Sequence, residues 1–467
     1  MELKNQKVLV VGTGLSGAGA VHLLHQQGAR VILLEQNTAK SRQDLENALE
    51  PADREAVEYV IGELPDTIRQ ELSLAVISPA VPTDSPLVAD LRARGVKIYS
   101  EIELAFHFEQ GRILAITGTN GKTTTTTLVG EIMKAFADRM NRTEQTKAHQ
   151  VFVVGNIGYS YAGIVSETTP ETVSVGEISS FQLESVECFH PQVSAILNIT
   201  PDHLNRHYTM ENYAAMKERI AENQTGKDFC VLNYEDPILR DFGEKKCPAA
   251  VIWFSSGRKL PDGYYLEGEN IFRAENGSSR LLMNVHEMHL VGVCNAENVM
   301  AALAICGAAG VPEELCLTVI RDFPPVEHRI EYVASRRGVD YYNDSKGTNP
   351  DAAIQGIRAM ERPTILIGGG YDKKNTYDEW IEAFDGKVKE LVLIGQTREA
   401  IAECARRHGF ERITFCDTFE ECLRHCTDAA EAGDAVLLSP ACASWGMFPN
   451  YEVRGKMFKE YVMQLDE

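Results

Sequence analysis

Short apolar runs alternate with amphipathic stretches of helical spacing along nearly the whole chain. The first runs, at 7–11 and 30–34, flank a helical pattern at 15–28. Further strand-like runs follow at 74–78, 96–99, 113–117, 151–154, 173–178 and 193–198. Such alternation is typical of βαβ units and parallel sheets. The pattern therefore predicts an α/β protein.

The pattern changes between 229 and 290, where short strands alternate with Gly, Asp and Asn turns. This predicts an antiparallel excursion at the edge of a middle domain. A helical pattern returns at 295–309, and a third α/β alternation has strands at 339–342, 364–368, 391–394, 413–415 and 436–439. A polar, basic stretch at 138–150 is expected to be a loop or a helix end. We place three domains at 1–112, 113–326 and 327–467.

Composition narrows the classes of partner. The chain has 467 residues and a formal net charge of −21, which argues against a nucleic-acid backbone or an anionic membrane as partner. It has no apolar run of the ~20 residues that span a bilayer. The 11 cysteines include no CxxC pair, and many free thiols fit a reducing cytosol, so a cytoplasmic location is expected. A monomer is one of the states that the sequence allows.

The closest cysteine pair is Cys422 and Cys426, with His425 between them. They lie in a stretch, 419–430, that predicts an amphipathic helix. A metal site there is a minor alternative, because a zinc site usually needs four ligands.

The first glycine-rich loop reads VLVVGTGLSG, with Gly12, Gly14 and Gly17 between a strand and a helix and Glu35 at the end of the next strand. Taken alone, this pattern fits a dinucleotide site. It equally serves any diphosphate at a helix N-terminus, or a tight turn without a ligand. All three interpretations stay open at this point.

The second loop reads ILAITGTNGKTTTTT. Amides of such a loop cradle phosphates, the lysine contacts the outer phosphates, and the threonine hydroxyl can hold Mg²⁺. Ile116 stands where the general pattern has glycine, so the loop is a variant.

This loop resembles the phosphate loop of the Mur ligase family and its folylpolyglutamate synthetase relatives. The likeness continues in order along the chain with EISSFQLE at 177–184, NITPDHLNRH at 198–207, NAEN at 295–298, EHR at 327–329 and NDSKGTNP at 343–350. The segment LSPACASWGMF at 438–448, with Tyr451 and Arg454, is similar to the members that add D-glutamate.

The resemblance implies three domains: a Rossmann-like N-terminal domain, a central P-loop ATPase-like parallel sheet with a small antiparallel edge, and a Rossmann-like C-terminal domain. It implies an ATP-dependent amide ligase of peptidoglycan precursor synthesis with ATP and two Mg²⁺ ions as cofactors. The substrates would be UDP-N-acetylmuramoyl-L-alanine and D-glutamate, joined through an acyl phosphate. The first domain would then bind the UDP moiety instead of NAD.

The resemblance also assigns roles to residues. Catalytic roles fall to Lys122, Glu177, His203 and Lys217, and metal ligation to Thr123, Glu177, His203 and, if carbamylated, Lys217. ATP contacts fall to Gly118, Thr119, Asn120, Gly121, Lys122, Thr123, Thr124, Asn295, Asn298, Arg329 and Asp344. Substrate contacts fall to Leu15, Ser16, Asn156, Gln182, Lys346, Thr348, Lys373, Ser444 and Tyr451.

Structural alternatives accompany these roles. Glu177 could be a helix-capping or surface carboxylate, His203 a satisfied loop histidine, and Asn295 and Asn298 helix N-caps. By its residues alone, Lys217 is one exposed helical lysine among many.

Some positions depart from the family pattern. Cys294 precedes Asn295 where a histidine is usual, Ala80 replaces a glycine, and Asn205 replaces an aspartate. Asn37 and Lys40 stand where we would look for an arginine near uracil or phosphate, which puts the uracil contacts in doubt.

Three rival functions remain to be weighed. An NAD- or FAD-linked oxidoreductase would explain Gly12–Gly17 but not the second loop. A sister ligase that adds another amino acid conflicts with the 438–448 segment. A non-catalytic nucleotide-binding regulator conflicts with the joint presence of Lys122, Glu177, His203 and Lys217.

Overall fold

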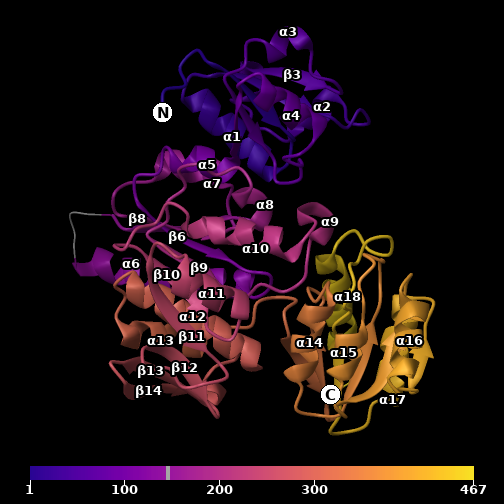
Figure 1. Cartoon of the computed structure of the whole chain (residues 1–467). Coiled ribbons are helices and arrows are strands. Elements are labelled where there is room, and N and C mark those ends of the chain that lie inside the picture. Colours follow the sequence, from indigo (N-terminus) through magenta and orange to yellow (C-terminus); the bar gives the residue numbers. More distant parts are fainter. Residues whose placement is uncertain (144–147, 467) are drawn as a thin grey trace. The chain divides into compact units, whose positions relative to one another are not determined.

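The computed structural model describes residues 1–143 and 148–466. The chain forms two compact units, which we describe separately (Figure 1). Unit 1 comprises Met1–Glu267, Phe272–Leu282 and Asn298–Ile320, and unit 2 comprises Gly268–Ile271, Met283–Glu297 and Arg321–Glu467. The predicted α/β class with mostly parallel sheets is confirmed.

The first sheet of unit 1 has five strands in the order β3-β2-β1-β4-β5, all paired in parallel. The strands are β1 (Lys7–Val11), β2 (Arg30–Glu35), β3 (Val57–Ile61), β4 (Leu74–Ile77) and β5 (Lys97–Ser100), with helices α1 (Leu15–Gln26), α2 (Arg42–Asn47), α3 (Asp66–Arg69) and α4 (Pro86–Ala93). The pattern missed β3, because an edge strand that is half exposed carries a weak hydrophobic signal.

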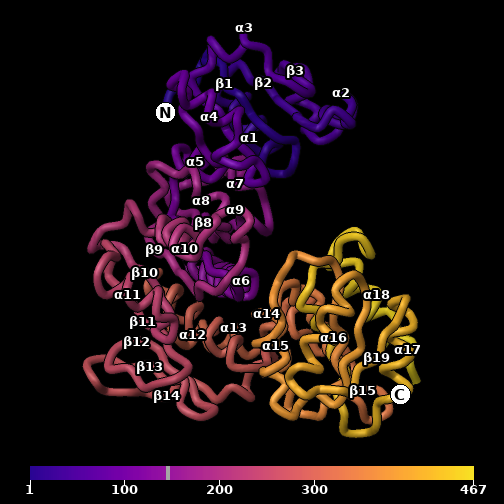
Figure 2. Tube along the Cα trace, turned by 45° about the vertical axis from the view of Figure 1, so that its right-hand side comes forward, coloured from indigo at the N-terminus to yellow at the C-terminus, as the bar shows by residue number. Residues whose placement is uncertain are grey.

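The second sheet has nine strands in the order β14-β13-β12-β11-β10-β9-β6-β8-β7. These are β6 (Arg112–Thr117), β7 (Gln150–Gly155), β8 (Thr172–Glu177), β9 (Val193–Ile196), β10 (Phe229–Asn233), β11 (Ala250–Ser255), β12 (Gly263–Glu267), β13 (Asn270–Glu275) and β14 (Ser278–Asn284). Its helices are α5 (Glu101–Phe106), α6 (Lys122–Thr143), α7 (Tyr161–Ile164), α8 (Ser180–Leu183), α9 (Leu204–His207), α10 (Met210–Glu218), α11 (Pro237–Lys245), α12 (Val293–Ala308) and α13 (Glu313–Asp322). Both views place α12 beside β11 and β12 (Figures 1 and 2).

The prediction of an antiparallel excursion from residue 229 onward was wrong for its first half. β10 pairs in parallel with β9, β11 with β10, and β12 with β11. Only the last three strands follow one another through two-residue turns, which is the connection of an antiparallel hairpin. At the second turn Asn276 and Gly277 both have positive φ, as a type I′ turn requires. The turn residues were recognised correctly, but the crossover helix α11 was overlooked. The stretch at 138–150 includes the end of α6; its residues 144–147 lie outside the described residues.

Unit 2 contains a six-stranded sheet in the order β15-β16-β20-β17-β18-β19. The strands are β15 (Glu331–Arg336), β16 (Val339–Asn343), β17 (Thr364–Gly368), β18 (Val388–Leu393), β19 (Ile413–Phe415) and β20 (Ala435–Leu438). The helices are α14 (Pro350–Arg358), α15 (Asp378–Glu382), α16 (Arg398–Arg407), α17 (Phe419–Ala429) and α18 (Tyr451–Met463). Only β15 pairs antiparallel, and as an exposed edge strand it was not anticipated.

The hydrophobic cores follow this division. In unit 1, one cluster joins Val8 and Leu33 of the first sheet to Tyr161 of α7 and Ile196 of the second sheet. Gly19 of α1 lies so close to Ser160 that a Cβ would come within 1.9 Å of its Oγ. The first two sheets of unit 1 therefore share a core to which helices between them contribute. Unit 2 has separate clusters on the two faces of its sheet.

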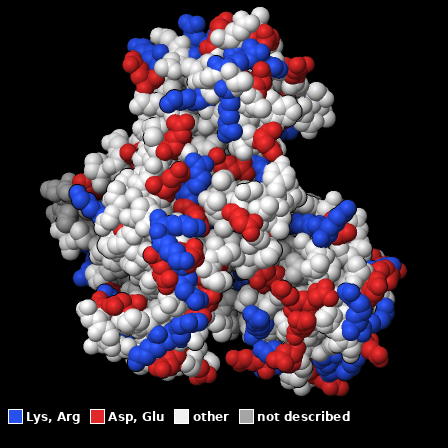
Figure 3. Space-filling view, viewed as in Figure 1, with Lys and Arg blue, Asp and Glu red and all other residues white. Residues whose placement is uncertain are grey.

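Two surface properties complete the description. None of the helices formed by residues 1–143 and 148–466 has the length and apolar character of a bilayer-spanning helix. Acidic and basic side chains are interspersed over the face shown in Figure 3.

Helix α17 confirms the amphipathic prediction at 419–430. Its Cys422 and Cys426 are buried, while His425 contacts Glu390 of β18, so these three do not form a metal cluster among the described residues.

Candidate active site

The second glycine-rich loop joins the carboxyl end of β6 to the first turn of α6. Gly118 and Gly121 have φ of +152° and +83°, in the region that favours glycine. A Cβ on Gly121 would lie 2.3 Å from Oδ1 of Asn298. The conformation of the loop therefore requires both glycines. The loop leads into the N-terminus of α6, and backbone N–H groups at such a position commonly bind phosphates.

Asn198 holds this loop from the side. The N–H of Asn120 donates to its Oδ1 at 2.8 Å, its Nδ2 donates to the Asn120 carbonyl at 3.2 Å, and the N–H of Thr119 donates to its carbonyl at 2.9 Å. Asn198 opens the NITPDH motif, yet the sequence analysis gave it no role. The available signal was a polar residue two positions after β9, the strand that pairs with the loop strand β6.

Two lysines converge on the loop. Lys122 Nζ donates to the carbonyls of Gly118 and Thr119, both at 2.8 Å, and Lys217 Nζ donates to the Gly118 carbonyl at 2.7 Å. Lys217 is only 1% exposed. Its interpretation as an exposed helical lysine is therefore wrong, because α10 turns this face toward the sheet together with Tyr213 and Ala214.

The protonation of Lys217 follows from this position. Burial, with the Lys122 ammonium adding to it, lowers the pKa of Lys217 well below its ordinary value. Asp202 and Glu177 oppose the shift but do not cancel it. This shift makes the neutral amine, which is a nucleophile, more accessible than in a solvent-exposed lysine.

Glu177 ends β8 and is 1% exposed. Its Oε1 accepts a hydrogen bond from Nδ2 of Asn156 at 2.7 Å, whereas its Oε2 is buried and has no hydrogen-bond partner among the described residues. It is not a helix cap, since Ser179 caps α8 with Gln182 in a capping box. A buried carboxylate oxygen that lacks a donor fits a cation.

Two of the four residues proposed as Mg²⁺ ligands offer oxygen donors, which Mg²⁺ prefers. Thr123 offers a hydroxyl in the first turn of α6, and Glu177 offers its carboxylate. His203 offers a ring nitrogen, a less usual Mg²⁺ ligand, and Mg²⁺ usually takes few protein ligands beside phosphates and water. Lys217 fits only as a carbamate, because an amine that donates to a carbonyl offers no oxygen. Thr124 is buried, so its contribution to the loop would come from its backbone N–H.

His203 lies at the N-cap of α9 with φ of +53°. Its side chain is 43% exposed, and Nε2 lies 3.5 Å from Oδ2 of Asp202. Its ring meets that of Phe181 at 4.8 Å between centroids. The histidine thus presents its ring to solvent on the same segment that brings Asp202 toward Lys217.

A network missed by the sequence analysis supports this segment. Arg206 donates two hydrogen bonds to the Glu184 carboxylate, at 2.9 and 2.7 Å, and stacks over Phe181. Glu184 also accepts the hydroxyl of Thr83 at 2.8 Å. Both residues stand in quoted motifs, but their pairing is visible only in three dimensions.

The two asparagines of NAEN are not N-caps, because α12 begins at Val293. Asn298 accepts the hydroxyl of Thr125 at 3.2 Å and lies against Gly121, next to the phosphate loop. Asn295 Nδ2 donates to the Val291 carbonyl at 2.7 Å. The division between the units falls between these two residues.

The first glycine-rich loop has a different environment. A Cβ on Gly17 would lie 2.0 Å from the Gly12 carbonyl, so Gly17 is needed for packing alone, whereas Gly14 faces open space. Leu15 is 66% exposed and Ser16 half-buried. Glu35 accepts hydrogen bonds from Thr13 at 2.6 Å and Lys40 at 2.8 Å, so this carboxylate of the dinucleotide-like pattern is engaged by neighbouring side chains.

In unit 2, Asp344 follows β16 and is 5% exposed. Its Oδ2 accepts the Ser439 hydroxyl at 2.6 Å and its Oδ1 the N–H of Ile330 at 3.2 Å. Burial raises the pKa of Asp344 to about 7, against these hydrogen bonds and the charges of Arg329 and Arg454. Near neutrality the carboxyl therefore exchanges between its charged and neutral forms.

Two of the residues expected to bind the amino acid in unit 2, Lys346 and Tyr451, contact each other, and a third, Lys373, contacts Trp445, which was not among them. Lys346 Nζ lies 3.8 Å from the centroid of the Tyr451 ring, and Lys373 Nζ lies 5.5 Å from that of the exposed Trp445. Ser444 is buried next to Trp445, and Thr348 is half-buried, its N–H donating to the Lys346 carbonyl.

Arg454, to which the sequence analysis gave no role, joins the segments that carry these residues. It donates to Oγ and the carbonyl of Ser345 at 2.9 and 2.7 Å and to the Cys442 carbonyl at 3.4 Å. Burial lowers the pKa of Arg454 to about 10. The loops before Thr348 and before Ser444 are therefore held to one buried guanidinium.

Comparison with known proteins identifies the family of the chain. Residues 6–100 match the "Mur ligase MurD-like, N-terminal domain", residues 116–306 the "Mur ligase middle domain", and residues 328–442 the "Mur ligase, glutamate ligase domain". The chain is 53% identical to UDP-N-acetylmuramoylalanine--D-glutamate ligase of Lachnospira eligens and 50% identical to that of Lachnoclostridium phytofermentans, each over 100% of both chains. The crystal structure of UDP-N-acetylmuramate-alanine ligase MurC from Thermotoga maritima has a TM-score of 0.59 at 18% identity, covering 98% of this chain and 99% of that one, and so shares the fold. The chain belongs to the Mur ligase family.

Proposed function

We propose that this chain is an ATP-dependent ligase that joins D-glutamate to UDP-N-acetylmuramoyl-L-alanine in peptidoglycan precursor synthesis. The relatives that carry this activity in their names match over the full length at 53% and 50% identity. The observation that carries the proposal is the convergence of Lys122 and Lys217 on the Gly118 carbonyl of the phosphate loop. Neither lysine has a use in a dinucleotide oxidoreductase.

The reaction has two steps. A carboxylate oxygen of the substrate bonds to the γ-phosphorus of ATP, the bridging P–O bond breaks, and ADP leaves. The amine of D-glutamate then bonds to the acyl carbon, the C–O bond to phosphate breaks, and the nitrogen releases a proton. Such phosphoryl transfer depends mainly on positioning and charge neutralisation.

The phosphate loop supplies both. Backbone amides of Gly118, Gly121, Thr123 and Thr124 would hold the phosphates, and Lys122 would leave its loop carbonyls for the outer phosphates. Thr119 and Asn120, whose N–H groups donate to Asn198, would shape the loop around the nucleotide. Asn298, which lies beside Gly121, and Asn295 on the same helix would contact the adenine. Arg329 and Asp344 would contact phosphate and ribose.

Thr123, Glu177 and His203 would hold Mg²⁺, which offsets the negative charge of the phosphates and the carboxylate. Asn156 keeps one Glu177 oxygen occupied and thereby fixes which oxygen is offered. The neutral Lys217 amine would add to CO₂, forming an N–C bond and releasing one proton. The resulting carbamate turns a cation into an anion beside the loop and would serve a second Mg²⁺.

The substrates would be divided between the segments. Residues 1–112 would hold the UDP moiety at Leu15 and Ser16, in the open space beside Gly14. Residues 113–326 would hold ATP, with Asn156 and Gln182 toward the muramoyl part. Residues 327–467 would bind D-glutamate through Lys346, Thr348, Lys373, Ser444 and Tyr451, since an ammonium and hydroxyls suit a carboxylate.

The test is phosphate release from ATP and Mg²⁺ with UDP-N-acetylmuramoyl-L-alanine and, in turn, D-glutamate, L-glutamate, L-alanine or meso-diaminopimelate. We expect release with D-glutamate alone. Release with another amino acid would keep the ligase and reject the assignment of Lys346, Ser444 and Tyr451 to D-glutamate. No release with any of the four, together with tight nicotinamide binding, would reject the ligase.

A further inference from the structure

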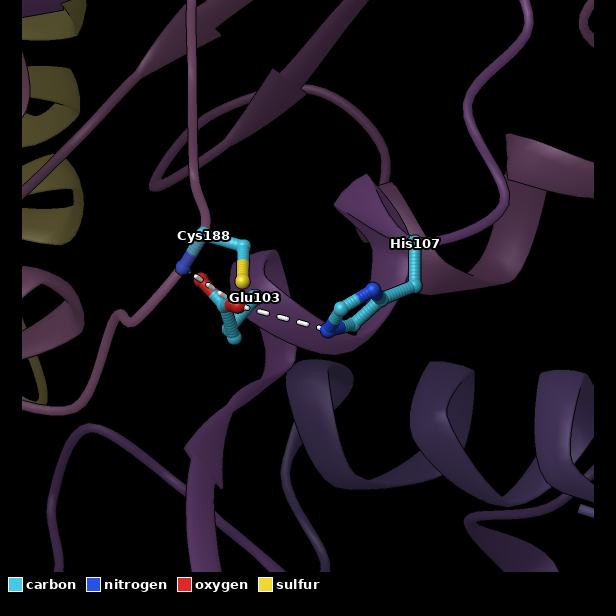
Figure 4. A group of neighbouring side chains, drawn as sticks. All are labelled: Glu103, His107 and Cys188. Atoms are coloured by element: carbon cyan, nitrogen blue, oxygen red, sulfur yellow. Dashed lines mark hydrogen bonds and ion pairs between the residues drawn. The ribbon is translucent and has the colours of Figure 1, made fainter. Parts of the chain in front are cut away.

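Three side chains with metal-binding atoms meet where α5 packs against the segment before β9. Glu103 lies on α5, His107 follows its last residue, and Cys188 belongs to the segment between α8 and β9. One ligand atom of each lies within 4.8 Å of the other two. Figure 4 shows the Cys188 sulfur and the His107 ring on two sides of the Glu103 carboxylate.

The donor atoms are only partly occupied. The Glu103 carboxylate is fully buried and accepts the N–H groups of Glu187, Cys188 and Phe189 at 3.0, 2.8 and 3.0 Å. His107 Nε2 is buried, lies 3.4 Å from Glu103 Oε1, and has no hydrogen-bond partner among the described residues. Cys188 is exposed and unbridged. The backbone around Cys188 therefore holds the Glu103 carboxylate, and the His107 nitrogen and the Cys188 sulfur lie close to it.

We propose that Glu103, His107 and Cys188 bind a zinc-class divalent cation with a solvent molecule in the fourth position. Sulfur, imidazole nitrogen and carboxylate oxygen together suit Zn²⁺, Cd²⁺ or Co²⁺ and do not suit Mg²⁺. Tetrahedral bonds of about 2.0–2.3 Å place ligand atoms roughly 3.3–3.8 Å apart, so movements on the order of 1 Å suffice. The exposed Cys188 side chain can supply them.

Binding would exchange a proton for the metal. The S–H bond of Cys188 breaks, a sulfur–metal bond forms, and the proton passes to buffer, with no change in oxidation state. A nucleophilic role is a poorer interpretation, since burial and the carboxylates of Glu103 and Glu187 raise the pKa of Cys188. A reactive thiol needs the opposite environment.

The position of the site suggests its effect. Glu103 and His107 lie in the stretch between residues 100 and 116, outside the matched N-terminal and middle domains. α5 links the first sheet to the second, and Cys188 follows Gln182 and Glu184 in the chain. A bound cation would thus fix the linking helix to a segment next to the proposed substrate residues.

Cobalt titration of the full chain tests the proposal, because a thiolate ligand gives Co²⁺ a charge-transfer band that oxygen and nitrogen ligands at the nucleotide site do not give. We expect the band to saturate at one equivalent, to be absent in Cys188→Ser, and to require at least about tenfold more Co²⁺ in His107→Asn. The matched control is Cys404→Ser, which removes the thiol of the other His–Cys–carboxylate group, Asp378–Cys404–His408. There Asp378 already contacts Arg407, so the band should remain.

A second measurement avoids any folding defect of the variants. In the unsubstituted protein, Zn²⁺ should slow alkylation of Cys188, mapped by mass spectrometry, by about tenfold or more, because the metal takes the thiolate that the reagent attacks. A cobalt band that persists in Cys188→Ser, the absence of a band in the unsubstituted protein, or unchanged alkylation of Cys188 would each overturn the proposal.

Discussion

The two glycine-rich loops of unit 1 share a backbone plan and differ in what surrounds it. Each joins a parallel strand to a helix N-terminus; the first has one glycine, Gly12, at positive φ, and the second has two, Gly118 and Gly121. Around the second loop stand Lys122, Lys217 and the unsatisfied oxygen of Glu177. Around the first, the nearest charges, Glu35 and Lys40, neutralise each other. The turn provides amides for any phosphate, and the neighbouring charges decide whether chemistry follows.

The largest effect is expected from removing Lys122, the lysine of the second loop. Lys122→Ala should lower kcat for phosphate release by about 10²–10³, because a cation that meets the transferring phosphoryl group is removed. Lys134→Ala, on the exposed face of the same helix, is the matched control and should leave kcat unchanged. Comparable activity in the two variants would show that the loop does not handle phosphate.

Lys217→Met keeps the volume of the side chain and removes its amine. Activity should fall by about 10² or more, because this variant cannot form a carbamate or hold a metal. In Lys217→Ala, a small added carboxylate should restore part of the activity by occupying the vacated space. Full activity without the lysine would remove it from the mechanism.

The same residue predicts a pH dependence of stability. With its pKa lowered in the folded chain, Lys217 binds fewer protons there than in the unfolded chain, so it makes the free energy of unfolding rise with pH up to about 10.5. Chemical denaturation at several pH values should show this slope in the unsubstituted protein and a smaller slope in Lys217→Met. Parallel curves would mean that the amine is already charged when buried.

Alanine substitutions at one glycine of each loop test whether the two loops differ in how tightly they are packed. Gly121→Ala should lower the free energy of unfolding by about 1–3 kcal/mol and abolish ATP binding, because its Cβ would meet Asn298 at 2.3 Å at a φ of +83°. Gly14→Ala has open space and should leave stability unchanged while raising KM for the UDP substrate. Thermal unfolding and the two KM values measure both, and equal stability losses would contradict the difference in packing.

The smallest effect is expected from Glu35→Gln. Its carboxylate holds Thr13 and Lys40 near the surface, so stability should change by about 1 kcal/mol or less. Nicotinamide dinucleotides should not bind to either form in fluorescence titration. If a nicotinamide dinucleotide bound tightly and Glu35→Gln abolished that binding, the first loop would be a dinucleotide site.

The sequence alone was enough to predict the α/β class, most of the parallel strands and the phosphate loop, because these depend on local periodicity and on glycines at fixed spacing. It missed β3 and β15, whose edge positions weaken the hydrophobic signal, and it overestimated the antiparallel part after residue 229, because turn residues do not report strand direction.

The environment of individual side chains became visible only in three dimensions. Examples are the burial of Lys217, the unsatisfied Glu177 oxygen, the hydrogen bonds of Glu35 and the cluster of Glu103, His107 and Cys188. Each depends on residues that are distant in the chain, or on which side of a helix or strand is buried, and the sequence pattern does not specify these. Burial and charge proximity act through space, so the desolvation and field that set reactivity are properties of the packed chain.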